Sequence, residues 1–211
     1  KEPRRYQREA IDDVVAGFET KDRGRLIMAC GTGKTFTSLK LVERMVPVGG
    51  TVLFLVPSIA LLQQTLNEWT ANADVPLRPF AVCSDASVGR RRASEDIAAS
   101  DLGFPASTDP AKLAARAAVS TGDEAVTVVF STYQSIDVVR QAQDLGLAEF
   151  DLVICDEAHR TTGVTEQGQD SSAFTMVHDP AKIRAAKRLY MTATPRVFGE
   201  EVKRKATDAD A

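Results

Sequence analysis

The sequence has few cysteines and no long apolar run. Its three cysteines, Cys30, Cys83 and Cys155, lie far apart in the chain, and neither a CxxC pair nor a histidine cluster accompanies them. This number and spacing exclude a closed disulfide framework and favour a reducing compartment, for which we expect the cytoplasm. The strongly apolar runs, such as residues 51–57 and 126–130, are far shorter than the ~20 residues that a membrane span requires. A transmembrane helix is therefore excluded, and no membrane partner is expected.

The chain also lacks a large excess of charge of either sign. Lys and Arg total 26 and Asp and Glu total 29, which gives a formal net charge of −3 at pH 7. This balance excludes a globally basic nucleic-acid-binding protein, so any contact with DNA has to be local. With 44% hydrophobic and 26% charged residues in 211, the composition is typical of one large globular domain or two small ones. The chain starts at Lys1 without an initiator Met or a signal peptide, and we expect it to be a piece of a longer protein.

The apolar residues follow two alternating periods along the chain. Apolar residues at helical spacing predict helices, and short β-branched or aromatic runs predict buried strands between them. This alternation predicts an α/β fold in which a mostly parallel central sheet is covered by helices on both faces. The predicted helices are residues 6–18, 35–46, 58–71, 109–119 and 133–143, and the predicted strands are residues 25–29, 51–56, 79–83, 125–131, 151–155 and 188–192.

A polar stretch interrupts this pattern at about residues 84–124. It is rich in Ala and Ser and contains three consecutive arginines, Arg90, Arg91 and Arg92. We interpret it as an insertion in a single domain of residues 1–205, followed by a short tail of residues 206–211. The arginines either form a loop that contacts phosphates or belong to a solvated surface.

A glycine-rich segment at residues 28–35 joins a predicted strand to a predicted helix. Gly31 and Gly33 allow the backbone N–H groups to converge, and the helix that follows adds the positive end of its dipole. In this position Lys34 would reach terminal phosphates and Thr35 would place a hydroxyl on Mg²⁺. Met28 stands where the general GxxxxGK[ST] pattern has its first glycine. Nucleotide binding is the favoured interpretation, and a turn that only connects the two elements is the alternative.

Two adjacent carboxylates follow the apolar strand at residues 151–155. Asp156 at a strand end suits Mg²⁺ binding, and Glu157 suits polarisation of an attacking water. The alternative is a solvated acidic strand end. The acidic pair arrives on a second buried strand after the glycine-rich segment, and this combination favours hydrolysis of a phosphoanhydride.

Six motifs in this order resemble the first RecA-like lobe of a superfamily 2 helicase or translocase, and the resemblance covers nearly the whole chain. Within that superfamily the chain is most similar to the motor part of restriction-modification enzymes, with the single-polypeptide type ISP enzymes as the nearest relatives. The segments that carry the resemblance are Gln7, residues 29–35, residues 56–58, residues 131–135, residues 156–159 and residues 192–195.

The resemblance implies that ATP and Mg²⁺ are the cofactors. Gln7 matches the glutamine that recognises adenine, and Arg4 occupies the companion basic position, although Arg4 also fits a solvated helix start. The implied nucleotide site consists of Arg4, Gln7, Cys30, Gly31, Thr32, Gly33, Lys34 and Thr35; Thr35 and Asp156 would bind the metal, and Lys34, Asp156 and Glu157 would be catalytic.

The resemblance also assigns residues to coupling and to nucleic acid. His159, Thr192 and Thr194 match positions that link the nucleotide state to the grip on DNA. Small hydroxyls and backbone N–H groups at strand ends can contact a sugar-phosphate backbone without reading sequence, but such segments also occur as ordinary helix caps. The implied nucleic-acid contacts are Pro57, Ser58, Ser131, Thr132 and Tyr133.

These implications lead to one expected function and two alternatives. The expected function is the ATP-binding lobe of a DNA translocase or helicase that requires a second RecA-like lobe, with nuclease or methyltransferase domains as further partners in the parent protein. We expect the isolated chain to bind Mg-ATP and to hydrolyse it poorly. The alternatives are a nucleic-acid-binding or interaction domain that does not cycle ATP, and an RNA helicase lobe.

Overall fold

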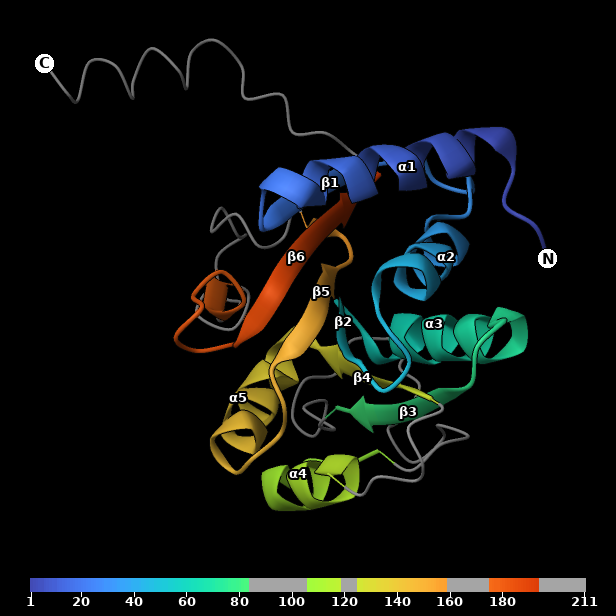
Figure 1. Cartoon of the computed structure of the whole chain (residues 1–211). Coiled ribbons are helices and arrows are strands. Elements are labelled where there is room, and N and C mark those ends of the chain that lie inside the picture. Colours follow the sequence, from blue (N-terminus) through green and yellow to red (C-terminus); the bar gives the residue numbers. More distant parts are fainter. Residues whose placement is uncertain (84–105, 119–124, 159–174, 194–211) are drawn as a thin grey trace, which may run out of the picture.

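The computed structural model of the chain describes residues 1–83, 106–118, 125–158 and 175–193 (Figure 1). The helices are α1 (Arg5–Thr20), α2 (Lys34–Met45), α3 (Ile59–Asn72), α4 (Pro110–Ala118) and α5 (Ile136–Asp144), with a 3₁₀ turn, η2 (Tyr133–Ser135), directly before α5. The strands are β1 (Arg23–Ile27), β2 (Thr51–Val56), β3 (Leu77–Val82), β4 (Val126–Thr132), β5 (Phe150–Cys155) and β6 (Ala185–Thr192).

The strands form one sheet in the order β1-β6-β5-β2-β4-β3, and every neighbouring pair is parallel. The predicted α/β fold is confirmed, and within the described residues its sheet is fully parallel. Because all strands run in one direction, the loops that follow β1, β2, β4, β5 and β6 leave the sheet at its carboxyl edge, where α/β proteins bind their ligands.

Helices cover both faces of the sheet, as the sequence predicts (Figure 1). One core lies under α1, α2 and α3, and the other lies under α5 with α4 packed beside it. Strand β2 supplies both cores in alternation: Phe54 belongs to the first, whereas Leu53 and Leu55 belong to the second. A strand with two buried faces reads as a continuous apolar run, which explains why its predicted bounds are confirmed.

Most predicted bounds differ from the structure by one or two residues; β1, for example, is Arg23–Ile27 rather than residues 25–29. Two differences are larger. The predicted helix at residues 133–143 is divided into η2 and α5, because the backbone turns tightly at Tyr133 before α5 begins. Strand β6 starts at Ala185 rather than at residue 188, since Arg188 lies inside the strand instead of at its exposed start. The Arg188 guanidinium is buried and donates to the carbonyl oxygens of Val177, Ala185 and Ile183, which satisfies its charge-bearing N–H groups.

Part of the predicted insertion is structured. Asp109 caps α4, and its Oδ1 accepts from the backbone N–H of Ala111 at 3.0 Å and of Lys112 at 3.2 Å, so the predicted helix start is confirmed. Ala106 forms a parallel bridge with Ala81 of the edge strand β3. Residues 84–105 and 119–124, and with them the three consecutive arginines, lie outside the described residues. None of the described helices is long and apolar enough to cross a membrane.

Candidate nucleotide site

The glycine-rich segment forms a loop between β1 and α2. Gly31 and Gly33 have φ angles of 75° and 82°, in the left-handed region that favours glycine. Gly33 is the N-terminal cap of α2 and supplies no capping side chain, so the first N–H groups of the helix remain directed at the loop. Cys30 is exposed in the same loop. A helix start with free N–H groups beside a curled loop is a site that favours anions such as phosphate.

The loop is fastened to the start of α1 by the residue predicted to recognise adenine. The Gln7 side chain is 5% exposed, and its Nε2 donates to the Thr32 carbonyl oxygen at 3.1 Å. Its Oε1 accepts from the backbone N–H of Arg4 at 2.8 Å, which satisfies an N–H group at the helix start. The Tyr6 hydroxyl donates to the same Thr32 carbonyl at 3.0 Å. The structure therefore brings Arg4, Gln7 and the loop together.

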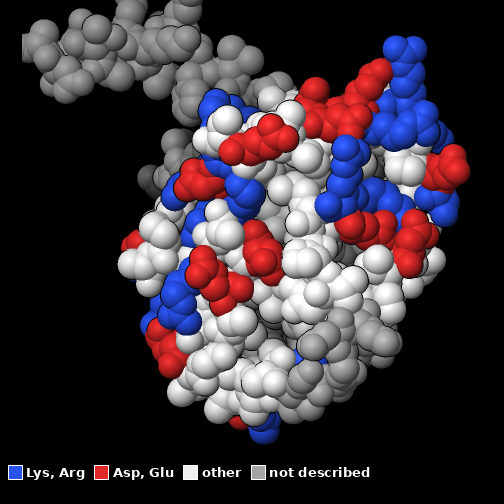
Figure 2. All heavy atoms as spheres, viewed as in Figure 1, with Lys and Arg blue, Asp and Glu red and all other residues white. Residues whose placement is uncertain are grey.

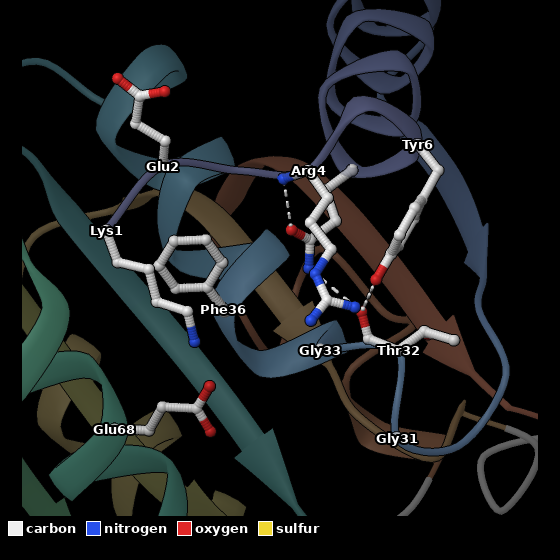
Figure 3. A pocket seen from close by; sticks show the side chains of 10 residues that line it. Lys1, Glu2, Arg4, Tyr6, Gly31, Thr32, Gly33, Phe36 and Glu68 are labelled. Atoms are coloured by element: carbon white, nitrogen blue, oxygen red, sulfur yellow. Dashed lines mark hydrogen bonds between the residues drawn. The ribbon is translucent and has the colours of Figure 1, made fainter.

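A pocket opens beside these contacts (Figure 3). Figure 3 shows Arg4 and Tyr6 lying over Thr32 and Gly33, whereas Phe36 of α2 and Glu68 of α3 lie across the pocket. The full lining is Lys1, Glu2, Arg4, Tyr6, Gln7, Gly31, Thr32, Gly33, Phe36 and Glu68.

The sequence prediction missed the aromatic and charged members of this pocket. Tyr6 directly precedes Gln7, and that adjacency is the signal that would have indicated it. Phe36 follows Thr35 in the first turn of α2, and Lys1 Nζ lies 5.2 Å from the centre of its ring. Glu68 carries no comparable signal, because its position in the pocket depends on how α3 packs beside α2.

The acidic pair lies at the end of β5 and faces the loop lysine. Lys34 Nζ is 3.6 Å from Glu157 Oε1, and the two side chains are 13% and 25% exposed. Glu157 has a φ of 51°, a left-handed conformation that is uncommon for a residue with a side chain. The side chain of Asp156 is buried, and its backbone N–H donates to the Leu55 carbonyl of β2 at 2.9 Å. The three residues predicted to be catalytic therefore lie in one place, with Lys34 paired to Glu157.

Burial controls the protonation of Asp156. The pKa of this carboxyl is raised to about 6, mainly by the loss of water on burial and also by the negative charge of Glu157. The backbone N–H of Glu157, which donates to Asp156 Oδ1 at 3.0 Å, and the charge of Lys34 act in the opposite direction. A buried carboxylate with a raised pKa is one whose negative charge lacks full compensation. A cation bound at Asp156 would supply that compensation.

The coupling residues are only partly covered by the structure. Thr192 is buried at the end of β6, and its carbonyl oxygen accepts from the backbone N–H of Met28 at 3.2 Å. This bond joins the end of β6 to the residue that leads into the glycine-rich loop. His159 and Thr194 lie outside the described residues.

The residues predicted to contact nucleic acid lie at the same sheet edge, but most of their side chains are buried. Ser58 is exposed and caps α3, its Oγ accepting from the Leu61 N–H at 3.3 Å. Pro57, Ser131 and Thr132 are buried. The hydroxyl of Ser131 donates to the Thr132 carbonyl, and that of Thr132 donates to Ser135 Oγ.

Tyr133 departs most clearly from its predicted role. Its side chain is 0% exposed, and its hydroxyl donates to the Asp156 carbonyl oxygen at 2.8 Å. A contact between this side chain and a nucleic acid does not fit the structure, because the ring is part of the second core.

Surface charge in the view of Figure 2 is mixed, with acidic and basic side chains interspersed. Several basic side chains at the start of α1 already have partners, since Arg5 pairs with Glu9 at 2.8 Å and Arg8 donates to the Pro3 carbonyl. Among the described residues, the face in this view is therefore not a broad basic surface.

The fold and the site together define the chain as a P-loop nucleotide-binding domain, with a phosphate loop after one parallel strand and an acidic pair after another. Residues 1–197 match the sequence model of the family described as type III restriction enzyme, res subunit, and the chain belongs to this family.

Known proteins of two kinds resemble the chain. It is 30% identical over 195 residues to a probable helicase of African swine fever virus (isolate Pig/Kenya/KEN-50/1950), a match that covers 92% of this chain and 20% of the viral protein. It is 28% identical over 203 residues to the type I restriction enzyme EcoAI endonuclease subunit of Escherichia coli, covering 93% of this chain and 20% of that subunit. The chain therefore spans about a fifth of the length of these curated relatives.

Solved structures agree with this placement. The ATP-dependent type ISP restriction-modification enzyme LlaBIII bound to DNA has a TM-score of 0.82 and 44% identity, covering 92% of this chain and 13% of the enzyme. The type ISP enzyme LlaGI, solved with a DNA substrate mimic, has a TM-score of 0.74 and 42% identity over 94% of this chain and 18% of that enzyme. The predicted resemblance to the motor lobe of restriction-modification enzymes, with its RecA-like fold, is confirmed.

Proposed function

We propose that this chain is the ATP-binding lobe of an ATP-dependent DNA translocase or helicase, the motor of a restriction-modification enzyme of the cytoplasm. One observation supports the proposal most directly: Lys34 Nζ lies 3.6 Å from Glu157 Oε1, so the lysine of the glycine-rich loop meets the acidic pair. A turn that only joined a strand to a helix would not require these groups to meet. This contact brings together a cation that can bind phosphate and two carboxylates, and hydrolysis of a phosphoanhydride requires these groups.

The contact between Lys34 and Glu157 provides a way for nucleotide binding to activate Glu157. When phosphates enter the loop, Lys34 pairs with them and releases the carboxylate of Glu157. The freed carboxylate then orients the attacking water and accepts its proton. Lys34 neutralises negative charge on the phosphates while the phosphoanhydride bond between them is broken. Lys34 thereby restrains Glu157 until ATP binds, and Glu157 becomes available only when ATP is present.

The residues near the loop fit an Mg²⁺ ion that binds together with the phosphates of the nucleotide. Within the described ranges, no group of three or more His, Cys, Asp or Glu side chains is arranged to hold a metal ion by itself. Mg²⁺ in such enzymes is bound by one or two protein oxygens together with phosphates and water, so a complete protein cage is not required. The Thr35 hydroxyl and the Asp156 carboxylate would hold it. The ion would neutralise charge that develops on the phosphates.

Gln7 retains the groups needed to select adenine. A glutamine amide has two N–H donors and two lone pairs, and one of each is used in the bonds to Thr32 and Arg4. The remaining N–H and lone pair match the acceptor and donor on one edge of adenine. The buried amide is already fixed by the other two bonds, so little conformational entropy is lost when the base binds.

DNA and a second lobe are the proposed partners. The two type ISP enzymes that resemble this chain were solved with DNA or a DNA substrate mimic. The chain spans only part of these proteins, and we propose that residues 1–205 form the first lobe, with an insertion at 84–124. Nuclease and methyltransferase domains would lie elsewhere in the parent protein. An arginine supplied by the second lobe would add a factor of about 10³ to 10⁵ in rate.

Binding and hydrolysis of Mg-ATP by the 211-residue chain, with and without duplex DNA, would test the proposal. Lys34→Ala should weaken binding by more than about tenfold, because the phosphates lose a charge-assisted contact. Lys112→Ala is the matched control, since this lysine is 75% exposed on α4. We expect binding that depends on Lys34, with little turnover by the chain alone.

Two results would contradict the proposal in different ways. Equal affinity in Lys34→Ala, with both proteins folded by circular dichroism, would exclude the phosphate-loop assignment. Rapid DNA-stimulated turnover by the 211-residue chain would exclude the need for a second lobe.

A further inference from the structure

A buried tyrosine links two strands that are not neighbours in the sheet. Tyr133 directly follows β4, and its hydroxyl reaches the backbone carbonyl of Asp156 at the end of β5, 2.8 Å away. Strand β2 lies between β4 and β5, so this hydrogen bond spans the end of β2. Tyr133 and Asp156 are 23 positions apart in the sequence, and Tyr133 is fully buried.

The bond fixes the backbone of Asp156 from a second side. The N–H of Asp156 is held by the Leu55 carbonyl of β2, and its carbonyl is held by Tyr133. These two bonds orient the peptide units on either side of the Cα atom from which the carboxylate projects. The same turn places the N–H of Glu157 on Asp156 Oδ1. The position of the acidic pair therefore depends on the position of Tyr133.

Tyr133 is a constant donor in this arrangement. Burial raises the pKa of its phenol well above the ordinary value, and the neighbouring Cys155 and Asp156 raise it further. Burial also raises the pKa of the Cys155 thiol to about 12. The phenol therefore keeps its proton across the pH range in which proteins are folded, and the bond to Asp156 is not a titrating switch.

The other end of the link is the turn after β4. Tyr133 begins η2, which is closed by the bond from Thr132 Oγ1 to Ser135 Oγ at 3.2 Å. The family resemblance assigns the segment from Ser131 to Tyr133 to nucleic acid; because these three side chains are buried, such a contact would be made by the backbone of the turn. The rigid aromatic ring of Tyr133 lies between this turn and Asp156, so a displacement of the turn would be transmitted to the backbone of Asp156 through the hydrogen bond.

We propose that Tyr133 is a positioning residue that couples the turn after β4 to Asp156, so that nucleic acid bound at the turn changes the affinity for Mg-ATP. The coupling rests on the proposed function, because it requires Mg-ATP at Asp156 and a nucleic acid at the carboxyl edge. Tyr133 touches neither ligand. Its role is transmitted through the hydroxyl alone, and the ring serves to fill the core.

Tyr133→Phe separates these two roles, because it removes the hydroxyl and keeps the ring. Tyr190→Phe is the matched control, because it also removes a tyrosine hydroxyl: that of Tyr190 is hydrogen-bonded to His178 Nδ1 at 3.0 Å, whereas that of Tyr133 is bonded to the Asp156 carbonyl. Mg-ATP affinity of the 211-residue chain is measured with and without duplex DNA, and the ratio of the two dissociation constants is the readout. A purely structural role would lower stability and leave this ratio unchanged.

We expect DNA to change the affinity of the wild-type chain and of Tyr190→Phe by on the order of tenfold, and that of Tyr133→Phe by less than about twofold. Equal ratios in wild type and Tyr133→Phe would overturn the inference and leave the proposed function intact. A wild-type chain that binds Mg-ATP through Lys34 without any response to DNA would also overturn it. Absence of Lys34-dependent binding would refute the proposed function itself.

Discussion

Replacement of Gly33 by alanine should destabilise the nucleotide-free chain more than the same replacement of Gly31. Both glycines have positive φ, so both alanine variants incur the left-handed backbone penalty of about 1–2 kcal/mol. Their surroundings differ. A Cβ on Gly33 would lie 2.7 Å from Gln7 Nε2, whereas a Cβ on Gly31 would have no atom within 4 Å.

The additional loss at Gly33 follows from the bonds of Gln7. A methyl group at 2.7 Å forces the Gln7 amide to move away from its bonds with Thr32 and Arg4. Two net hydrogen bonds at about 1 kcal/mol each give an extra ~2 kcal/mol for Gly33→Ala. For a chain of this size that difference corresponds to a further fall in Tm of about 4–8 °C.

Thermal and urea unfolding without nucleotide measures the difference, and the background variant Gln7→Ala isolates its cause. In that background no amide is present to be displaced, so the two glycine variants should become equally destabilising. Equal effects of Gly31→Ala and Gly33→Ala in the wild-type background would refute the reasoning. So would an extra loss at Gly33 that persists when Gln7 is alanine.

Three further predictions concern the site and its supports. The pKa of Asp156 in the folded chain, about 6, exceeds the ordinary value of 3.8, so the folded chain binds this proton more tightly than the unfolded chain does. The free energy of unfolding should therefore rise as pH falls from about 6 to about 4. Asp156→Asn should flatten that slope and stabilise the nucleotide-free chain at pH 7 by roughly 2–3 kcal/mol, as measured by urea unfolding across pH. Lys40 is buried and donates to Glu43 at 2.8 Å, so Lys40→Met should cost about 2 kcal/mol, and addition of Glu43→Gln should restore part of it. Trp69 is the single tryptophan and donates to the Thr35 carbonyl at 3.1 Å, so its emission should change when Mg-ATP binds and should not change in Lys34→Ala.

Elements and motifs were predictable where the physical requirement is local. Strand β2 is apolar on both faces because both faces are covered, and its bounds follow from that run alone. The glycine-rich loop and the acidic pair were found because phosphate and Mg²⁺ require those residue types after a strand. Strand β6 was predicted too short, since an arginine inside a strand reads as its exposed end until its carbonyl partners are known.

Contacts between distant segments were not predictable. The order of strands places β6 between β1 and β5, and no spacing in the sequence indicates this arrangement. Phe36 and Glu68 join the pocket beside Gln7 only through the packing of α2 and α3. Tyr133 was assigned to nucleic acid because its neighbours match such a segment. Its burial depends on the second core, which is assembled from residues between Leu53 and Ile183 and cannot be inferred from the motif.

The two proposed metal ligands are supported from opposite sides of the sheet by buried aromatic side chains. Trp69 belongs to the core under α1, α2 and α3 and donates to the Thr35 carbonyl, whereas Tyr133 belongs to the core under α5 and donates to the Asp156 carbonyl. Trp69 is further fixed by edge-to-face contacts with Phe54 and Phe130, at ring-centre distances of 5.2 and 5.5 Å.

Trp69 and Tyr133 are each connected to a segment that is proposed to contact nucleic acid. Helix α3, which carries Trp69, starts at the exposed cap Ser58, and Tyr133 starts the turn after β4. A packed core transmits displacement because its side chains have no free volume in which to absorb it. Under the proposed function, nucleic acid bound at these segments would therefore act on Thr35 and Asp156 without touching either. In this arrangement the aromatic residues, rather than additional polar groups, connect these segments to Thr35 and Asp156, and they do so at positions where sequence spacing indicates only core packing.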